Sequence, residues 1–115
     1  MTKITAYTIL KELGNEALNK YIYENIAEPI FDSHRITNPF PQDFKGHYER
    51  MLTAHSTEGS VEARNIVIAN LIGIYLGRNK KALNIRKIGN NVSKNMNGKE
   101  TQTSLWEKHY SNKQH

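Results

Sequence analysis

The sequence predicts an all-α fold: a small bundle of about four to five helices around a long apolar central helix, followed by a basic, partly mobile C-terminal segment. Apolar residues recur at helical spacing through residues 2–31 and 43–55, and residues 61–77 are apolar on nearly every face. The 115 residues suffice for one domain with its own core. We place that helical domain at residues 1–88 and the basic segment at residues 89–115.

The N-terminal half is expected to consist of helices separated by glycine and proline. The first amphipathic stripe runs through Leu10, Leu13, Ala17 and Tyr21. Gly14 interrupts this stripe and predicts two helices in place of one. Regular helix is expected to end near Pro29, and the two prolines within residues 32–42 predict a loop.

Residues 61–77 form the most apolar part of the chain, with Ser60 placed to cap a helix. The β-branched residues in 65–76 leave a buried strand as an alternative, but the segment is long for a strand, and we favour a helix. Ala69, Gly73 and Gly77 recur every four residues, which allows a second helix to approach closely. Packing inside the fold is the favoured interpretation, and self-association through this stripe is the alternative.

The last third of the chain is polar and is expected to be only partly ordered. The amphipathic pattern of residues 80–88 predicts a short helix that ends at Gly89 and Asn90. Residues 89–104 are rich in Asn, Gly, Lys, Ser and Thr and are predicted to be mobile. Leu105, Trp106 and Tyr110 predict a short helix near residues 103–111 that docks on the body.

Charge is distributed unevenly along the chain, whose net charge is +5. Residues 1–77 contain seven Lys and Arg against nine acidic residues, whereas residues 78–115 contain nine Lys and Arg against two acidic residues. A basic segment on a near-neutral body is the pattern expected for a polyanionic partner, here DNA or RNA. A solvated lysine-rich tail is the alternative.

The first functional hypothesis is a small nucleic-acid-binding accessory protein that contacts phosphates through residues 78–99. Lys and Arg neutralise phosphates, and Asn can hydrogen-bond to base edges. The short, Asn-, Lys- and Ile-rich composition is compatible with accessory proteins of phages or mobile elements. The candidate binding residues are Arg78, Lys80, Lys81, Asn84, Arg86, Lys87, Asn91 and Lys94.

Two other functions remain open. A protein–protein interaction module, such as an inhibitor or immunity-type helical bundle, ranks second. A small metal-independent nuclease or toxin ranks third, because Asp43, His47 and Arg50 share one helical face. There the aspartate can orient the histidine as a general base while the arginine holds a phosphate. A solvated helix face explains the same row more simply, so a non-enzymatic protein is favoured.

Several classes are disfavoured by the composition. Without cysteine there is no disulfide, no thiol nucleophile and no thiolate zinc site, and a cytoplasmic location is expected. The five histidines lack the spacing of metal ligands, and no glycine-rich phosphate loop occurs, so no metal or cofactor is predicted. The longest apolar stretch, residues 66–76, falls short of the roughly 20 residues that span a bilayer.

Overall fold

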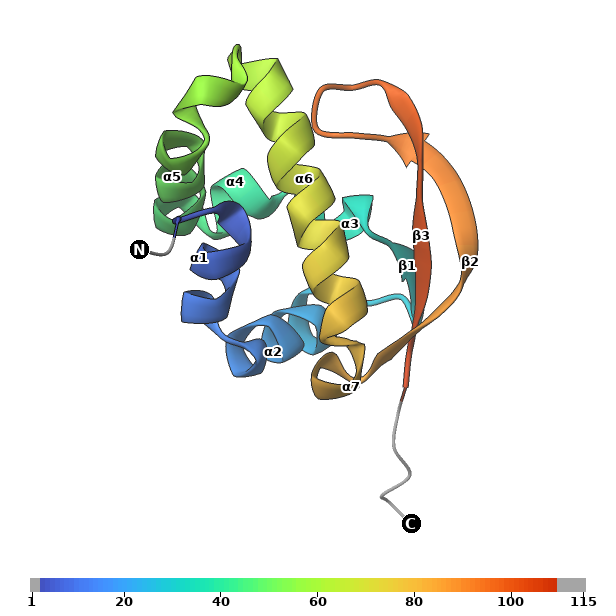
Figure 1. The fold of residues 1–115 in the computed structure, drawn as a ribbon. Helices are drawn as coiled ribbons and strands as arrows, with labels where there is room; N and C mark the ends of the chain where they lie inside the picture. Colours follow the sequence, from blue (N-terminus) through green and yellow to red (C-terminus); the bar gives the residue numbers. More distant parts are fainter. Residues whose placement is uncertain (1–2, 110–115) are drawn as a thin grey trace.

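The computed structural model describes residues 3–109 and has an α+β architecture in place of the predicted all-α bundle. Helices occupy one side of the molecule and a three-stranded antiparallel sheet the other (Figure 1). The all-α prediction is wrong because much of the polar last third, expected to be helical or mobile, pairs as strands.

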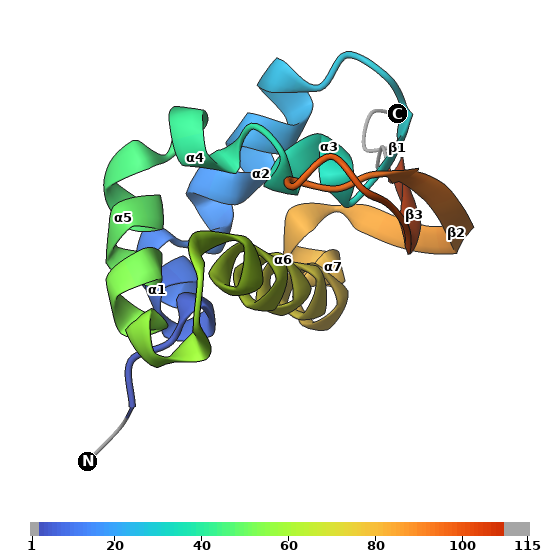
Figure 2. The ribbon, with the colours of Figure 1, turned by 90° about the horizontal axis from the view of Figure 1, so that it is seen from above.

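The elements follow one another along the chain with the helices concentrated in the first two thirds. The helices are α1 Ala6–Leu13, α2 Asn15–Asn25, α3 His34–Thr37, α4 Phe40–Asp43, α5 Lys45–Ala54, α6 Val61–Arg78 and α7 Lys80–Leu83, with a 3₁₀ turn at Ser56–Glu58. The strands are β1 Ile30–Asp32, β2 Ile85–Lys94 and β3 Glu100–Lys108, in the spatial order β1-β3-β2. Viewed from above, α6 lies between α1 and α5 on one side and the sheet on the other (Figure 2).

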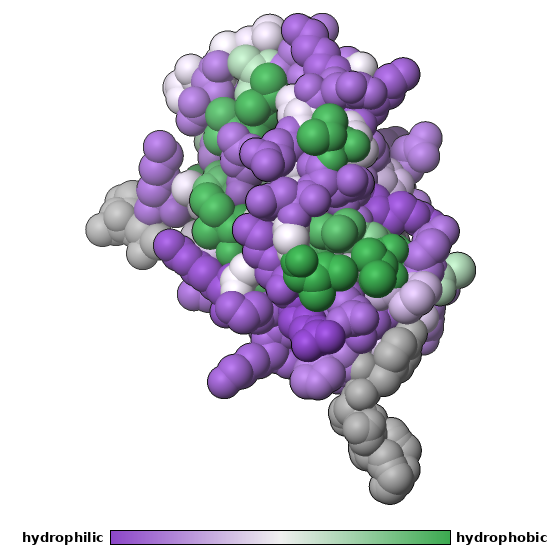
Figure 3. All heavy atoms as spheres, turned by 90° about the vertical axis from the view of Figure 1, so that its right-hand side faces the viewer, coloured by the Kyte–Doolittle hydropathy of each residue, from purple (hydrophilic) through white to green (hydrophobic). Residues whose placement is uncertain are grey.

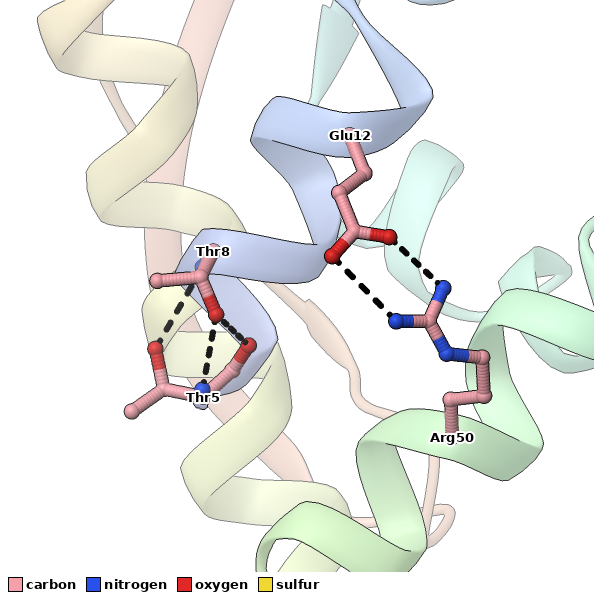
Figure 4. Close-up of polar contacts among 4 residues, drawn as sticks. All are labelled: Thr5, Thr8, Glu12 and Arg50. Carbon is pink, nitrogen blue, oxygen red and sulfur yellow. Dashed lines mark hydrogen bonds and ion pairs between the residues drawn. The ribbon is translucent and has the colours of Figure 1, made fainter. Parts of the chain in front are cut away.

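Side-chain caps and one ion pair fix the N-terminal helices. Thr5 and Thr8 form a reciprocal capping box: the Thr5 hydroxyl accepts from the Thr8 amide, and the Thr8 hydroxyl accepts from the Thr5 amide at 2.8 Å (Figure 4). Gly14, at φ 94°, separates α1 from α2 as predicted. Arg50 of α5 donates to both carboxylate oxygens of Glu12, and this hydrogen bonding lowers the pKa of Glu12.

The capping box gives a first stability prediction. Thr5→Ala removes the side-chain acceptor for the Thr8 amide, and we expect the free energy of unfolding to fall by about 1 kcal/mol. Thr53→Ala is the matched control, because Thr53 is exposed near the end of α5 and bonds only the Glu49 carbonyl of its own helix. Urea denaturation of both variants measures the difference. Equal stability of the two would contradict the contribution of the cap.

Helix α6 confirms the choice of helix over strand for its segment, and Ser60 caps it by accepting from the Ala63 amide. It is not the long apolar helix that we predicted, however. One face is buried through Ile68, Ile72, Tyr75 and Leu76, whereas Ile66 and Ile74 remain 46% and 45% exposed. Among the described residues, no helix has the length and apolar character needed to cross a membrane.

The small-residue stripe of α6 does not pack against another helix. A Cβ added at Gly73 or Gly77 would meet no neighbouring atom within 4 Å. Ala69 and Gly73 instead line a cleft between α6 and the sheet. The prediction of close helix packing inside the fold is therefore wrong, and self-association through this stripe stays a prediction.

The segment expected to form a helix over residues 80–88 turns into a strand halfway. Helix α7 ends at Leu83, and Asn84 adopts the left-handed conformation at φ 60°, which redirects the chain into β2. The apolar row of that predicted helix is split as a result, since Ile85 is buried while Ile88 and Val92 are 40% and 61% exposed. The register slips between Lys87 and Gly89, which marks a β-bulge.

The predicted mobile stretch, residues 89–104, forms the end of β2, the turn and the start of β3. Strand β3 also replaces the predicted short helix near residues 103–111, of which residues 110–111 lie outside the described part of the chain. The expected docking of Trp106 is confirmed, since this side chain is 2% exposed and its Nε1 donates to the Ser33 hydroxyl at 2.9 Å. Phe31 of β1 lies opposite Trp106 in the register and joins the same core. The hairpin therefore shares one core with the helices, and the predicted boundary at residues 88/89 falls inside β2.

Candidate functional site

A cleft of about 620 Å³ separates α6 from β3. Its lining consists of Ser33, His34, Thr37, Asn65, Ile66, Ala69, Asn70, Gly73, Ile74, Asn95, Met96, Asn97, Thr101, Gln102, Thr103 and Ser104. None of these carries a fixed charge, and the histidine is the single titratable side chain among them. A concave site of this size with a mixed apolar and polar lining is typical of small-ligand pockets.

The two walls of the cleft differ in chemistry. Helix α6 contributes the apolar side chains Ile66 and Ile74, and the small residues Ala69 and Gly73 keep this wall concave. Strand β3 contributes the hydroxyl and amide groups of residues 101–104. Within residues 3–109, no hydrogen bond engages the side chains of Asn70, Gln102, Thr103 or Ser104. These groups are therefore available to a ligand.

The turn between β2 and β3 closes one end of the cleft by contacting α6. The Asn97 amide donates to the Glu62 carbonyl at 3.0 Å, and the Asn65 amide donates to Asn97 Oδ1 at 3.1 Å. The Tyr48 hydroxyl of α5 donates to Asn65 Oδ1 and lies 3.2 Å from the Met96 sulfur. Hydrogen bonds from α6 and the Tyr48 side chain of α5 thus hold the turn in place at the end of the cleft.

A chain of polar contacts that leads to His34 in the cleft lining begins at Asp32. Its carboxylate accepts from the Ser93 hydroxyl at 2.7 Å, from the Asn91 amide at 2.9 Å and from the Arg35 backbone amide at 3.1 Å. Burial works to raise the pKa of Asp32, but these three hydrogen bonds together outweigh it and lower the pKa below its ordinary value. The carboxylate is therefore ionised at neutral pH and acts as an acceptor.

These hydrogen bonds determine which nitrogen carries the proton when the His34 ring is neutral. The residue is 8% exposed. The Ser93 hydroxyl donates its proton to Asp32, so it accepts from His34 Nδ1 at 2.7 Å. The proton of the neutral ring therefore sits on Nδ1, and Nε2 carries a lone pair. Nε2 lies 3.4 Å from the Thr101 hydroxyl on the cleft wall. Asp32 and Ser93 thus present an acceptor nitrogen at the cleft.

Thr37 of α3 is the most unusual polar group in the lining. The residue is 1% exposed, yet its hydroxyl has no hydrogen-bond partner among the described residues. A buried hydroxyl without a partner costs about 1–3 kcal/mol. Such a cost marks a position where a partner from outside the chain would be favourable.

A second, shallower hollow lies on the other side of His34. Its lining adds Asp32, Arg35, Asn38, Pro39, Ser93 and Lys94 to the histidine. Arg35 and Lys94 are both exposed there, and Arg35 is 3.7 Å from the exposed carboxylate of Glu28. His34 therefore lines both a cleft without charged side chains and a hollow that contains Asp32, Arg35 and Lys94.

The structure does not join the predicted catalytic residues Asp43, His47 and Arg50 into one site. Asp43 accepts from the Tyr21 hydroxyl at 2.6 Å, and Arg50 pairs with Glu12 at 2.9 Å. The His47 ring stacks edge-on at 6.5 Å from that of Phe44. Over residues 3–109, no hydrogen bond or ion pair connects the three with one another.

The predicted nucleic-acid-binding residues fall into two groups. The first group is engaged within the fold: Arg78 lies over the Tyr7 ring, Arg86 pairs with Glu107, Asn91 bonds Asp32, and Asn84 forms the turn before β2. The second group consists of Lys80, Lys81, Lys87 and Lys94, which are exposed. In the part of the chain that the structure describes, none of these four lysines forms an ion pair.

Sequence reasoning missed most of the cleft. The decisive pairing joins Asp32 and His34 to residues 91–93, about sixty positions away, and no periodic pattern links such distant residues. No family model, curated protein or solved structure matches this chain. No group of three or more potential metal-binding side chains occurs between residues 3 and 109.

Proposed function

We propose that the protein is a nucleic-acid-binding accessory protein that contacts phosphates through residues 78–99. The observation that carries the proposal is the set of four exposed lysines on α7 and β2, Lys80, Lys81, Lys87 and Lys94, which have no ion-pair partner among residues 3–109. Unpaired lysines keep their full charge available, and release of counterions from a polyanion then favours binding. The proposal keeps the cytoplasmic setting predicted from the cysteine-free sequence.

The extended strand supports contacts to more than one phosphate. Lys87 and Lys94 lie near the start and at the end of β2, and a strand rises about 3.3 Å per residue. Successive phosphates of one DNA strand are separated by about 3.4 Å along the helix axis. The two lysines are therefore far enough apart to contact different nucleotides.

A protein partner is the second candidate, because the sheet side exposes apolar side chains. Ile30, Ile88 and Val92 are 45%, 40% and 61% exposed. Figure 3 shows this side as mostly hydrophilic, with separate hydrophobic patches. Scattered apolar residues are common on protein surfaces, so the lysines favour the nucleic-acid proposal.

Fluorescence anisotropy tests the proposal with labelled single- and double-stranded DNA and RNA over a range of salt. We expect binding that weakens steeply with salt, with a logarithmic slope of about 0.9 per phosphate contact on duplex DNA. The quadruple variant Lys80→Gln, Lys81→Gln, Lys87→Gln, Lys94→Gln is expected to lose binding at least about tenfold and to show a shallower slope.

A second quadruple variant controls for total charge. Lys3, Lys11, Lys20 and Lys45 are equally exposed and lie in the N-terminal half, so their replacement by glutamine removes the same charge elsewhere. This variant is expected to keep most of the affinity. Equal losses in both quadruple variants, or no binding by the wild type at moderate salt, would contradict the proposal.

A further inference from the structure

We propose that the cleft between α6 and β3 binds one unpaired nucleobase of a single-stranded nucleic acid. The inference rests on the proposed function and specifies its ligand. A base can enter the cleft only from a strand in which that base is unstacked and unpaired, so the ligand is single-stranded. It is carried by the lining of the cleft, by the unpartnered hydroxyl of Thr37 and by the fixed acceptor of His34.

The charge of the lining excludes a phosphate and favours an uncharged ligand. Among residues 3–109, no lysine, arginine, aspartate or glutamate lines the cleft. An anion there would lose its hydration without gaining a cation. A nucleobase is neutral, and its phosphates would remain outside at the lysines.

The two walls match the two surfaces of a planar base. The faces of a base are apolar, and Ile66, Ile74 and Met96 offer apolar contact. The edges of a base carry hydrogen-bond donors and acceptors, and β3 offers Gln102 with the neighbouring hydroxyls. Asparagine and glutamine amides pair well with such edges because each presents a donor beside an acceptor.

One buried polar group in the lining points to a missing ligand. The Thr37 hydroxyl is buried without a partner among residues 3–109. The exposed side chains of Asn70 and Gln102 have no hydrogen bond within the same residues and are free to bond a ligand. His34 adds an acceptor, because Asp32 and Ser93 hold its proton on Nδ1 and leave Nε2 toward Thr101 and the cleft. A ligand with an amino or imino group would replace the Thr101 hydroxyl, 3.4 Å away, as the donor to this nitrogen.

The hollow behind His34 provides a place for the phosphate joined to that nucleotide. It shares His34 with the cleft and contains Arg35 and Lys94 together with Asp32, whose carboxylate accepts from Ser93, Asn91 and the Arg35 backbone amide. The two cations outnumber this one carboxylate, so the hollow favours an anion while the cleft favours a neutral base. A base held in a duplex cannot enter such a cleft without unpairing, so we expect preference for single strands.

Two glycine substitutions in α6 test the inference with the intact chain. Gly73 lines the cleft and Gly77 does not, and a Cβ at either position meets no atom of residues 3–109 within 4 Å. Leucine is a better helix former than glycine, so Gly73→Leu and Gly77→Leu are both expected to keep or raise thermal stability. Only Gly73→Leu fills the cleft.

The probes are the four free ribonucleosides, monitored by chemical-shift titration, together with single- and double-stranded oligonucleotides of equal length. We expect at least one nucleoside to bind the wild type and Gly77→Leu, and Gly73→Leu to weaken that binding at least about tenfold. Thr37→Val, which removes only the unpartnered hydroxyl, is expected to weaken it several-fold without loss of stability.

The outcomes separate this inference from the proposed function. If oligonucleotides bind the wild type, Gly73→Leu and Gly77→Leu equally and no nucleoside binds, the cleft inference is overturned while the phosphate-binding proposal stands. If a nucleoside binds in a Gly73-dependent way but oligonucleotides do not bind, the lysine surface is refuted and the cleft is supported as a nucleoside site. Equal affinity for single and double strands also overturns the inference.

Discussion

Replacing Trp106 with alanine is expected to lower the free energy of unfolding by about 3–5 kcal/mol. The indole is 2% exposed, and it is the largest fully buried side chain of the sheet. Its removal takes apolar surface away from the interface of sheet and helices and leaves the Ser33 hydroxyl without the Nε1 donor. Chemical denaturation monitored by circular dichroism measures the loss.

Trp106→Phe serves as the control because it keeps an aromatic ring but lacks the indole nitrogen. We expect a smaller cost than for alanine, of about 1–3 kcal/mol, from the lost hydrogen bond and the reduced volume. A loss below about 1 kcal/mol for Trp106→Ala would show that the hairpin contributes little to the common core.

Alkaline pH is expected to unfold the protein through its buried tyrosines. Burial raises the pKa of Tyr48 to about 12, and burial with the hydrogen bond to Asp43 raises the pKa of Tyr21 further. In the unfolded chain these phenols ionise near pH 10. Because the folded pKa values are higher, their contribution to stability is complete below about pH 10 and is lost as pH rises toward 12.

Tyr48→Phe tests this alkaline dependence, since phenylalanine keeps the ring but cannot ionise. The variant loses the bond to Asn65 and is expected to be less stable at neutral pH, yet its stability should fall less steeply above pH 10. The measurement is thermal unfolding as a function of pH, combined with the ultraviolet absorbance of tyrosinate. Parallel curves for wild type and variant would contradict the assignment to Tyr48.

Lys108 acts in the opposite direction over the adjoining pH range. Burial lowers the pKa of this lysine, whose ammonium donates to the Ile26 carbonyl beside the Tyr23 ring. The unfolded chain then holds the proton more tightly, so this group raises stability as pH approaches about 10.4. Deprotonation of Lys108 therefore raises the free energy of unfolding up to about pH 10.4, and ionisation of the tyrosines lowers it at higher pH.

The helical part of the fold was predictable because its signals are local. Ser60 caps α6, Gly14 separates α1 from α2, and α5 follows the predicted stripe over residues 43–55. Within the predicted loop of residues 32–42, however, the structure has helix α3, most of helix α4 and the last residue of strand β1. Prolines 39 and 41 fit the first turns of short helices as well as they fit loops.

The hairpin was not predictable in the same way. Ile85, Ile88 and Val92 are spaced as on a helix, but only Ile85 is buried, and a bulge at Ile88 breaks the alternation expected of a strand. Residues 101–104 of β3 are polar throughout and border the cleft in place of the core. Periodicity of apolar residues carries no information about such a strand.

One part of the candidate site was visible in the sequence, and the other part was not. Lysine accumulation is visible in the sequence, so the proposal of a phosphate-contacting surface rests on charge that the sequence already reveals. The cleft depends on β3 lying along α6, and thus on pairing that sequence periodicity did not reveal. The row Asp43, His47 and Arg50 had ideal helical spacing, yet Asp43 and Arg50 bond to residues of other helices.

The pairing of β1 with β3 has a consequence for how the chain is made. Phe31 leaves the ribosome long before Trp106, its partner in the register, and translation adds about 5–20 residues per second. For several seconds the nascent helices therefore carry an apolar surface that the last strand alone can cover. Chaperone binding to stalled nascent chains should be strongest when the stall precedes residue 106 and should fall once that residue has emerged.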